Sequence, residues 1–341
     1  MTATPLLALL LVTGMGFAAH RASLCTVRAV SEVMTSGTAY MLASFAKAVL
    51  WTMAVSGSLI LLCSADPQPV FMRLPSTAAL LGGFVFGVGA AINGGYSFST
   101  LQRLADGETI MMVSLIGMIA GFVGTSYGVT QLPALALHPV NAGWPWRLPW
   151  AGALLGTLWI WAAWELVKLY RGSTPNAGLL GRLLADPYRF SSAAAVLGIG
   201  GGFLYAVQGA WTYTNFLRNE ASYRIAAAPP PSSTQALLLS GLVVGMLLSS
   251  WHRGALRLRK PVLSELPAKL VGGLLMSVGG TLIPGGNDTL LLAAIPTIPV
   301  HAGAVFIALL AGVASALAVM RRRLGGSPMD ACAGDRCHGT D

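Results

Sequence analysis

Apolar residues in this chain gather in long runs that short polar or Gly-rich stretches separate. Most runs are near the ~20 residues that a bilayer-spanning helix needs. They cover residues 4–20, 40–63, 77–93, 109–132, 148–169, 191–209, 235–251, 268–283 and 302–320. The third run continues to residue 102 after a break. The pattern predicts an all-α polytopic membrane protein with nine transmembrane helices.

A Gly-rich motif occurs twice along the chain. The stretch Gly82–Ser97 is echoed by Gly272–Asp288, and six residues are identical once one insertion is allowed before Pro284. Downstream, Ala120-Gly121 falls on Ala311-Gly312. Matching helix breaks in two halves of an apolar chain are typical of transporters and channels, in which interrupted helices mark the substrate path.

Composition supports the membrane class. The 341 residues are 55% hydrophobic and only 10% charged, with a mean hydropathy of +0.68, whereas about a quarter of the residues in a soluble domain are charged. The net charge of +9 does not predict nucleic-acid binding, because much of it lies in short clusters between apolar runs, as in positive-inside loops. These clusters contain Lys168, Arg171, Arg182, Arg189, Arg253, Arg257, Arg259, Lys260, Arg321, Arg322 and Arg323.

The clusters also predict an orientation. They follow the fifth, seventh and ninth runs, so the C-terminus is expected inside and the N-terminus outside. If runs one to four repeat as runs six to nine, the fifth is a linker and the two halves are inverted in the bilayer. The expected units are a first membrane repeat, a linker with the fifth helix, a second, inverted repeat and a cytoplasmic tail. Their bounds are residues 1–137, 138–190, 191–324 and 325–341.

Two segments are too short and too polar to face lipid. Residues 21–37 and 211–228 each follow the first helix of a repeat, and Thr26 corresponds to Thr212. They are predicted to be short re-entrant helices, which membranes tolerate only where protein or water covers them. The same alignment places Cys25 opposite Trp211. The first apolar run lacks a basic n-region and is interpreted as a membrane helix, not as a signal peptide.

The candidate transport path begins at the two glycine pairs. Each pair and the polar residues after it predict a helix break, and the N-terminus of the following half-helix favours an anion. The alternative is close helix packing through small residues. The residues in question are Gly94, Gly95, Tyr96, Ser97, Gly285, Gly286, Asn287 and Asp288. Asp288 is open to two interpretations, an ion or proton site and a helix N-cap, and the sequence favours the cap.

Cys25 has two possible roles. A free cysteine in apolar sequence is commonly a small packed residue. Arg21 and Arg28, at i−4 and i+3, can share its helix face, and cationic neighbours stabilise a thiolate and attract anions. Four charges in or near apolar sequence, on Arg21, Arg28, Glu32 and Lys47, either face the substrate or snorkel at the membrane edge.

The sequence gives little support for an enzyme. It contains no Walker loop, no dinucleotide fingerprint and no HExxH motif, and its five histidines are scattered without metal-ligand spacing. Cys332 and Cys337-His338 lie in a polar tail, but their spacing is not a standard zinc pattern, and disorder is the favoured interpretation. No metal or other cofactor is therefore predicted.

Taken together, these motifs resemble the YeeE/YedE family of sulfur transporters. The resemblance rests on Gly16-Phe17 followed by Arg21 and Cys25, and on the repeats that end in Gly94-Gly95 and Gly285-Gly286. It implies nine spans with short re-entrant helices around an hourglass-shaped interior. It further implies thiosulfate uptake through a relay of cysteine thiols, and in some members a cytoplasmic sulfur-carrier partner of the TusA type.

One departure from the family pattern affects the substrate. The family places a cysteine directly after each glycine pair, where this chain has Tyr96 and Asn287, so only Cys25 of three relay thiols remains. A three-cysteine relay cannot operate as the family has it. Hydroxyl and amide groups can instead bind an oxyanion or another polar solute.

The prediction is a nine-span transporter of the bacterial inner membrane that imports a small sulfur-containing anion, such as thiosulfate. Arg21 attracts the anion, Cys25 contacts it, and Trp211 and Tyr96 narrow the passage. One alternative is a transporter or channel for a different solute. Another is a membrane subunit whose tail docks a soluble sulfur carrier, which deletion of residues 327–341 would test.

Overall fold

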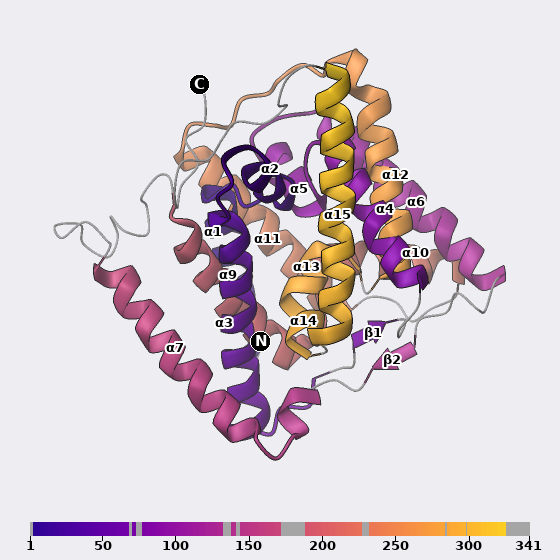
Figure 1. Cartoon of the computed structure of the whole chain (residues 1–341). Coiled ribbons are helices and arrows are strands. Elements are labelled where there is room, and N and C mark those ends of the chain that lie inside the picture. Colours follow the sequence, from indigo (N-terminus) through magenta and orange to yellow (C-terminus); the bar gives the residue numbers. More distant parts are fainter. Residues whose placement is uncertain are drawn as a thin grey trace.

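The computed structural model describes the chain from residue 3 to residue 324 with eight internal gaps (Figure 1). The described residues are 3–67, 70–72, 77–131, 138–140, 144–171, 188–226, 232–283, 285–297 and 299–324. The predictions made for the tail with Cys332 and Cys337, and for Arg182 and Pro284, fall outside them.

Within the described residues, nine long helices form the body of the protein. They are α1 (Ala3–Arg21), α3 (Tyr40–Leu62), α4 (Thr77–Asn93), α6 (Met111–Gln131), α7 (Ala151–Arg171), α9 (Phe190–Gln208), α11 (Ser233–His252), α12 (Leu266–Leu282) and α15 (Pro299–Leu324). By length and composition, the described residues hold eight candidate membrane-spanning segments, which include all of these helices except α7. The all-α polytopic fold is confirmed, and the ninth span remains a prediction because Glu165, Lys168 and Arg171 lower the hydropathy of α7.

Short helices lie between the long ones. They are α2 (Thr26–Ser36), α5 (Ser97–Ala105), α10 (Tyr213–Ala226) and a continuous helical segment formed by α13 (Asn287–Thr289), the π-turn η4 (Leu290–Ala294) and α14 (Ile295–Thr297). In Figure 1, α2 and α5 lie in the upper half of the molecule and α13 and α14 in the lower half. Helices α2 and α10 fall on the two segments predicted to be re-entrant, and their place in the bilayer stays a prediction.

The remaining elements are small. Strands β1 (Val70–Met72) and β2 (His138–Val140) form an antiparallel ribbon in which Val70 lies opposite Val140. The ribbon lies at the lower right of Figure 1. Two 3₁₀ turns, η2 (Trp144–Arg147) and η3 (Leu263–Glu265), precede α7 and α12.

Helices α4 and α12 cross at the centre of the bundle through the repeated glycines. A Cβ on Gly279 would lie 2.5 Å from the carbonyl oxygen of Gly82, and a Cβ on Gly272 would lie 2.9 Å from that of Gly89. Gly82 corresponds to Gly272 in the repeat, and Gly89 corresponds to Gly279. The contacts are therefore reciprocal, as a two-fold relation between the halves requires, and only small residues allow this approach.

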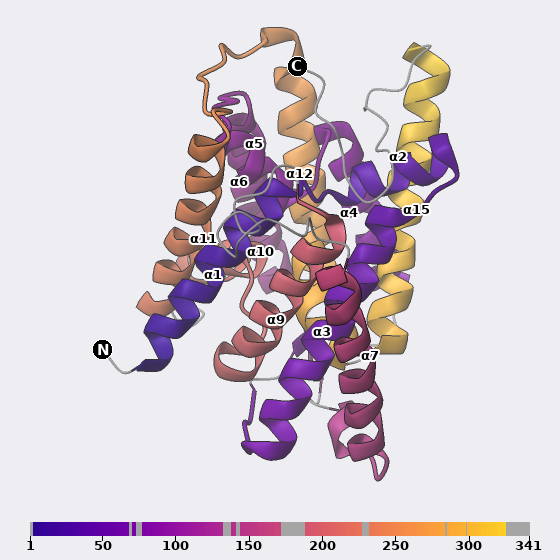
Figure 2. The same ribbon diagram turned by 90° about the vertical axis from the view of Figure 1, so that its left-hand side faces the viewer.

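The other helix pairs follow the same relation. Helix α1 packs on α11 and its counterpart α9 packs on α3, while α6 packs on α12 and its counterpart α15 packs on α4. Figure 2 shows these helices side by side, with α7 at the edge against α3. The repeat boundaries and the orientation in the bilayer stay predictions.

Candidate functional site

Helix α4 ends at the first glycine pair for a specific backbone reason. Gly94 adopts a φ of +77°, its N–H donates to the carbonyl of Ala91, and the N–H of Gly95 donates to that of Ala90. This is a Schellman C-cap, in which glycine accepts the left-handed conformation without a steric penalty. The chain therefore leaves α4 at Gly94 and starts α5 at Ser97.

The second break is more crowded than the first. Gly285 has a φ of +135°, and a Cβ there would collide with the Thr289 hydroxyl and lie 2.7 Å from the side-chain oxygen of Asn215. Gly286 is the N-cap residue of α13. The predicted helix breaks at both glycine pairs are thus present.

The two breaks bring the N-termini of four short helices together. The Cys25 sulfur at the start of α2 lies 3.6 Å from the hydroxyl of Ser99 in α5. The Asn287 amide at the start of α13 donates to the Thr26 hydroxyl over 2.8 Å.

Helix α10 completes this group from the second half of the chain. The hydroxyls of Thr212 and Thr289 are 2.6 Å apart, and Asp288 accepts hydrogen bonds from the backbone N–H and the hydroxyl of Thr214. We call this region, where α2, α5, α10 and α13 begin, the junction.

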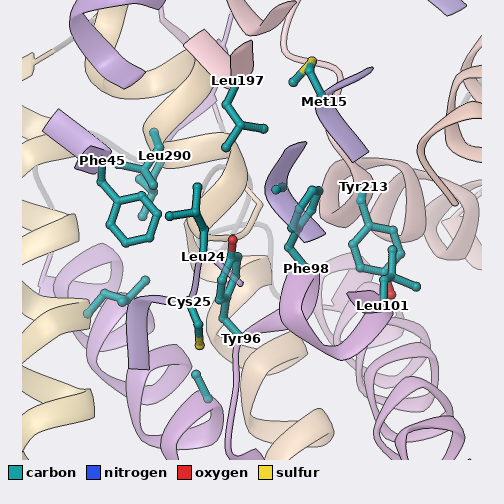
Figure 3. Close-up of a cluster of buried hydrophobic side chains, with 14 of the residues drawn as sticks. Met15, Leu24, Cys25, Phe45, Tyr96, Phe98, Leu101, Leu197, Tyr213 and Leu290 are labelled. Carbon is teal, nitrogen blue, oxygen red and sulfur yellow. The ribbon is translucent and has the colours of Figure 1, made fainter. Parts of the chain in front are cut away.

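Cys25 lies inside the junction. It is the N-cap residue of α2, is 5% exposed, and its backbone N–H points at the Met41 sulfur over 3.5 Å. Figure 3 shows the Cys25 sulfur pointing away from the hydroxyl of Tyr96. The Tyr96 ring stacks on Phe98 with centroids 6.2 Å apart and planes 12° apart.

A cavity of about 610 Å³ opens from one side of the junction toward the end of the molecule where α15 finishes. Cys25, Gly94 and Ser99 form part of its wall near the junction. Its other polar or charged lining residues are His20, Ser23, Arg28, Gln102, Arg103, Asp106, Glu108, Glu265 and Lys269. This larger cavity is therefore polar and rich in ionisable groups.

A much smaller cavity, of about 30 Å³, lies against the other half of the junction. Phe98, Trp211, Thr212 and Asp288 contribute to its wall, which is otherwise mostly apolar. The buried residues Thr26, Tyr96, Ser97 and Asn287 line neither cavity. The narrow waist that the family resemblance implies stays a prediction.

Several buried polar atoms of the junction have no hydrogen-bond partner among the described residues. They are Ser97 Oγ, Trp211 Nε1, Tyr213 Oη, Asn215 Oδ1 and Asn287 Oδ1. Leaving a buried polar group unpaired costs about 1–3 kcal/mol, so such a cluster needs an explanation. Binding of a polar solute at the junction is one.

The helix starts differ in their capping. No side chain caps α2 at Cys25 or α5 at Tyr96, although both regions are fully described. The Asp288 carboxylate instead caps α10 through the N–H of Thr214. Asp288 thus caps α10, because the junction brings the two helix starts together, whereas the N-cap residue of its own helix α13 is Gly286.

Arg21 does not line either cavity. Its guanidinium is buried, lies 2.6 Å from His252 Nδ1 and stacks over the Phe17 ring at 5.1 Å. Its predicted attraction of the anion stays a prediction. Arg28 does line the larger cavity.

The other two charges that the sequence singles out have structural partners. Glu32 is buried and accepts hydrogen bonds from the N–H groups of Tyr40 and Met41, which caps the start of α3. Lys47 lies 2.5 Å from the buried Glu165, and the pair joins α3 to α7. Both lie outside the lining of the larger cavity.

Sequence reasoning missed the three residues that give the larger cavity its inner polar surface, Gln102, Arg103 and Lys269. Lys269 lies at the start of a predicted span. The available signal was a lysine in an apolar helix, which is costly and commonly functional.

The rim of the larger cavity carries a hydrogen-bonded network. Asp106 accepts hydrogen bonds from His20 over 3.0 Å and from the Ser250 hydroxyl over 2.7 Å. Burial alone would raise the pKa of Asp106, but these bonds and the nearby charges of His20 and Arg253 lower it overall. The backbone carbonyl of Asp106 also accepts a hydrogen bond from the backbone N–H of Arg257.

Comparison with known families decides the class of the protein. A family model for sulphur transport matches residues 21–315. The chain belongs to this sulphur transport family. Its match spans the four short helices, both glycine breaks and most of the residues that line the two cavities.

No curated protein matches the chain. The family membership confirms the expected resemblance and the assignment to sulfur transport. It is also compatible with a protein that is not an enzyme. Within the described residues, no group of three or more His, Cys, Asp or Glu side chains could hold a metal ion.

Proposed function

We propose that the protein imports a small sulfur-containing anion, thiosulfate or a close relative, across a bacterial inner membrane. The observation that carries this proposal is the meeting of four helix N-termini at one buried point, next to a thiol. Each N-terminus carries partial positive charge and N–H groups that favour an anion. The lack of side-chain caps on α2 and α5 leaves those groups free to do so.

In this proposal, the junction recognises both ends of thiosulfate. The N–H groups at the starts of α2 and α5 and the Ser97 hydroxyl donate to the sulfonate oxygens. The Cys25 thiol donates an S–H hydrogen bond to the terminal sulfur. Tyr96 and Trp211 narrow the passage, and the larger cavity leads to the cytoplasm. This direction rests on the basic clusters near that end, with the N-terminus periplasmic and the C-terminus cytoplasmic.

Uptake of radiolabelled thiosulfate into proteoliposomes tests the proposal. Cys25→Ala should reduce uptake at least about ten-fold, since it removes a contact to the sulfur worth about 1.5–3 kcal/mol for a charged partner. Cys63→Ala is the matched control, because Cys63 is the exposed free cysteine at the end of α3. Normal uptake by Cys25→Ala would exclude the thiol role.

Tyr96 and Asn287 favour one alternative substrate class. They offer hydroxyl and amide groups where the family has thiols, so an oxyanion without a terminal sulfur is the second candidate. A competition assay distinguishes the two substrate classes. If the substrate is an oxyanion without a terminal sulfur, excess sulfate should inhibit uptake as strongly as excess thiosulfate does. A TusA-like carrier protein stays a predicted partner. Deletion of residues 327–341 should leave vesicle uptake unchanged if the tail only docks such a protein.

A further inference from the structure

Lys269 is a buried cation in the wall of the larger cavity. It is 7% exposed, and its ammonium group donates to the carbonyl oxygen of Asn93 over 2.9 Å. Its acidic neighbour Glu265, at 3.5 Å, is half exposed to solvent. A lysine in an apolar helix is costly unless it faces a cavity or a partner, and this one does both.

Arg103 approaches the same point from α5. A Cβ on Gly94 would lie 3.4 Å from Nη1 of Arg103 and 3.7 Å from the Lys269 nitrogen. Two cationic groups therefore converge beside Gly94, and the absence of a side chain there leaves space between them. Glu108 binds Arg103 through Nε and Nη2, at 2.8 and 2.6 Å, so Nη1 remains directed toward Gly94.

Two further groups increase the capacity of this region to bind an anion. The Gln102 side chain is 6% exposed, and its Nε2 has no hydrogen-bond partner in the described part of the chain. Arg28 lines the cavity and has no acidic partner within 4.0 Å among the described residues.

The three acidic groups of the cavity are already engaged. Asp106 is bound by His20 and Ser250, Glu108 by Arg103 and Arg259, and Glu265 only loosely by Lys269. The lining holds three cations, Arg28, Arg103 and Lys269, and as many carboxylates. Because Arg259, outside the lining, shares Glu108 with Arg103, Arg28 is the lining cation left without an acidic partner among the described residues.

The repeat counterparts of this cluster carry no charge. By the repeat alignment, Lys269 corresponds to Ala79, and the other cluster residues also have uncharged counterparts. Arg28, Gln102, Arg103 and Asp106 correspond to Thr214, Ala293, Ala294 and Thr297. The fold does not require charge at these positions, since in each case the other repeat builds the corresponding helix without it.

We propose that Lys269, Arg103 and Gln102, with Arg28 nearby, form a second oxyanion-binding site in the larger cavity, separate from the junction. It takes a small tetrahedral sulfur oxyanion, whose oxygens accept hydrogen bonds from the ammonium, guanidinium and amide groups. That this site lies on the transport path rests on the proposed function. That it binds an oxyanion does not depend on the proposed function.

Sulfate binding to the full-length protein in nanodiscs tests this site. Sulfate shares the oxyanion and lacks the terminal sulfur that Cys25 would contact, so it probes the charged cluster. Lys269→Gln and Arg103→Gln should each weaken binding of radiolabelled sulfate at least about ten-fold at low ionic strength, and added salt should reduce the difference. Lys269→Arg should stay within about three-fold of the wild type, since it keeps the charge.

Two controls make the result specific. Arg259→Gln removes an exposed arginine that also contacts Glu108, and it should leave sulfate affinity unchanged. Arg224→Gln removes an exposed arginine that pairs with Glu220 and lines neither cavity, and it should also leave sulfate affinity unchanged. Equal affinity in the wild type and Lys269→Gln, or no sulfate binding by the wild type, would overturn the inference. Lys269-dependent binding without thiosulfate uptake would instead contradict the proposed function and leave this site standing.

Discussion

The two cavities that flank the junction differ in size and in charge, although corresponding segments of the two halves contribute to both. The larger one, at about 610 Å³, contacts the uncapped starts of α2 and α5. The smaller one, at about 30 Å³, is mostly apolar and contacts α10, which Asp288 caps. The repeated glycines preserve the backbone arrangement, and side-chain divergence makes the two sides chemically unequal.

The largest expected effect concerns the two glycine breaks. Gly285→Ala should destabilise the protein by roughly 1–3 kcal/mol and abolish uptake, because it combines a φ of +135° with collisions against Thr289 and Asn215. Gly94→Ala should cost less, roughly 1 kcal/mol, since its φ is +77° and no atom lies within 3.4 Å of the added carbon. Thermal unfolding in detergent measures both. A greater loss for Gly94→Ala would contradict the difference in crowding.

A second change tests the lost thiols. Tyr96→Cys combined with Asn287→Cys restores the family pattern at both glycine pairs. The ratio of thiosulfate uptake to sulfate uptake should rise about ten-fold, which is the factor that the free energy of one good polar contact gives. Tyr96→Ala combined with Asn287→Ala is the control, because it removes the same side chains and the bond to Thr26 without adding a thiol. Unchanged selectivity in the double variant would indicate that these positions do not line the path.

The smallest expected effect lies at the rim of the larger cavity. The pKa of Asp106 is lower in the folded protein than in the unfolded chain, where it is about 3.9. The ionised carboxylate therefore stabilises the folded state above that pH, and this contribution is lost as the pH falls through the folded pKa. Asp106→Asn should lower stability by roughly 1 kcal/mol at pH 7. The difference between the two unfolding temperatures should shrink below pH 4. A difference that grows on acidification would contradict the sign of this shift.

The sequence predicts much of this architecture because its strongest signals are local. Long apolar runs identify the helices, and the pairs Gly94-Gly95 and Gly285-Gly286 mark the breaks, since glycine alone readily adopts those backbone angles. The reciprocal packing of α4 and α12 also follows from the repeated glycines.

Contacts between distant segments could not be predicted in the same way. The capping of α10 by Asp288, the pairing of Lys47 with Glu165, and the approach of Lys269 to Arg103 all join residues far apart in the chain. No spacing rule links such residues, because only the packed bundle brings them together. Arg21 illustrates the limit, since its position near Cys25 in the sequence does not place it in the cavity.

The most direct test of the account is a cryo-electron microscopy structure of the protein in nanodiscs with thiosulfate. The account predicts density for the anion at the junction, in contact with the Cys25 sulfur and the starts of α2 and α5. The same density should be absent from Cys25→Ala under the same conditions. Thiosulfate bound elsewhere, with the junction empty at concentrations that saturate uptake, would contradict the account.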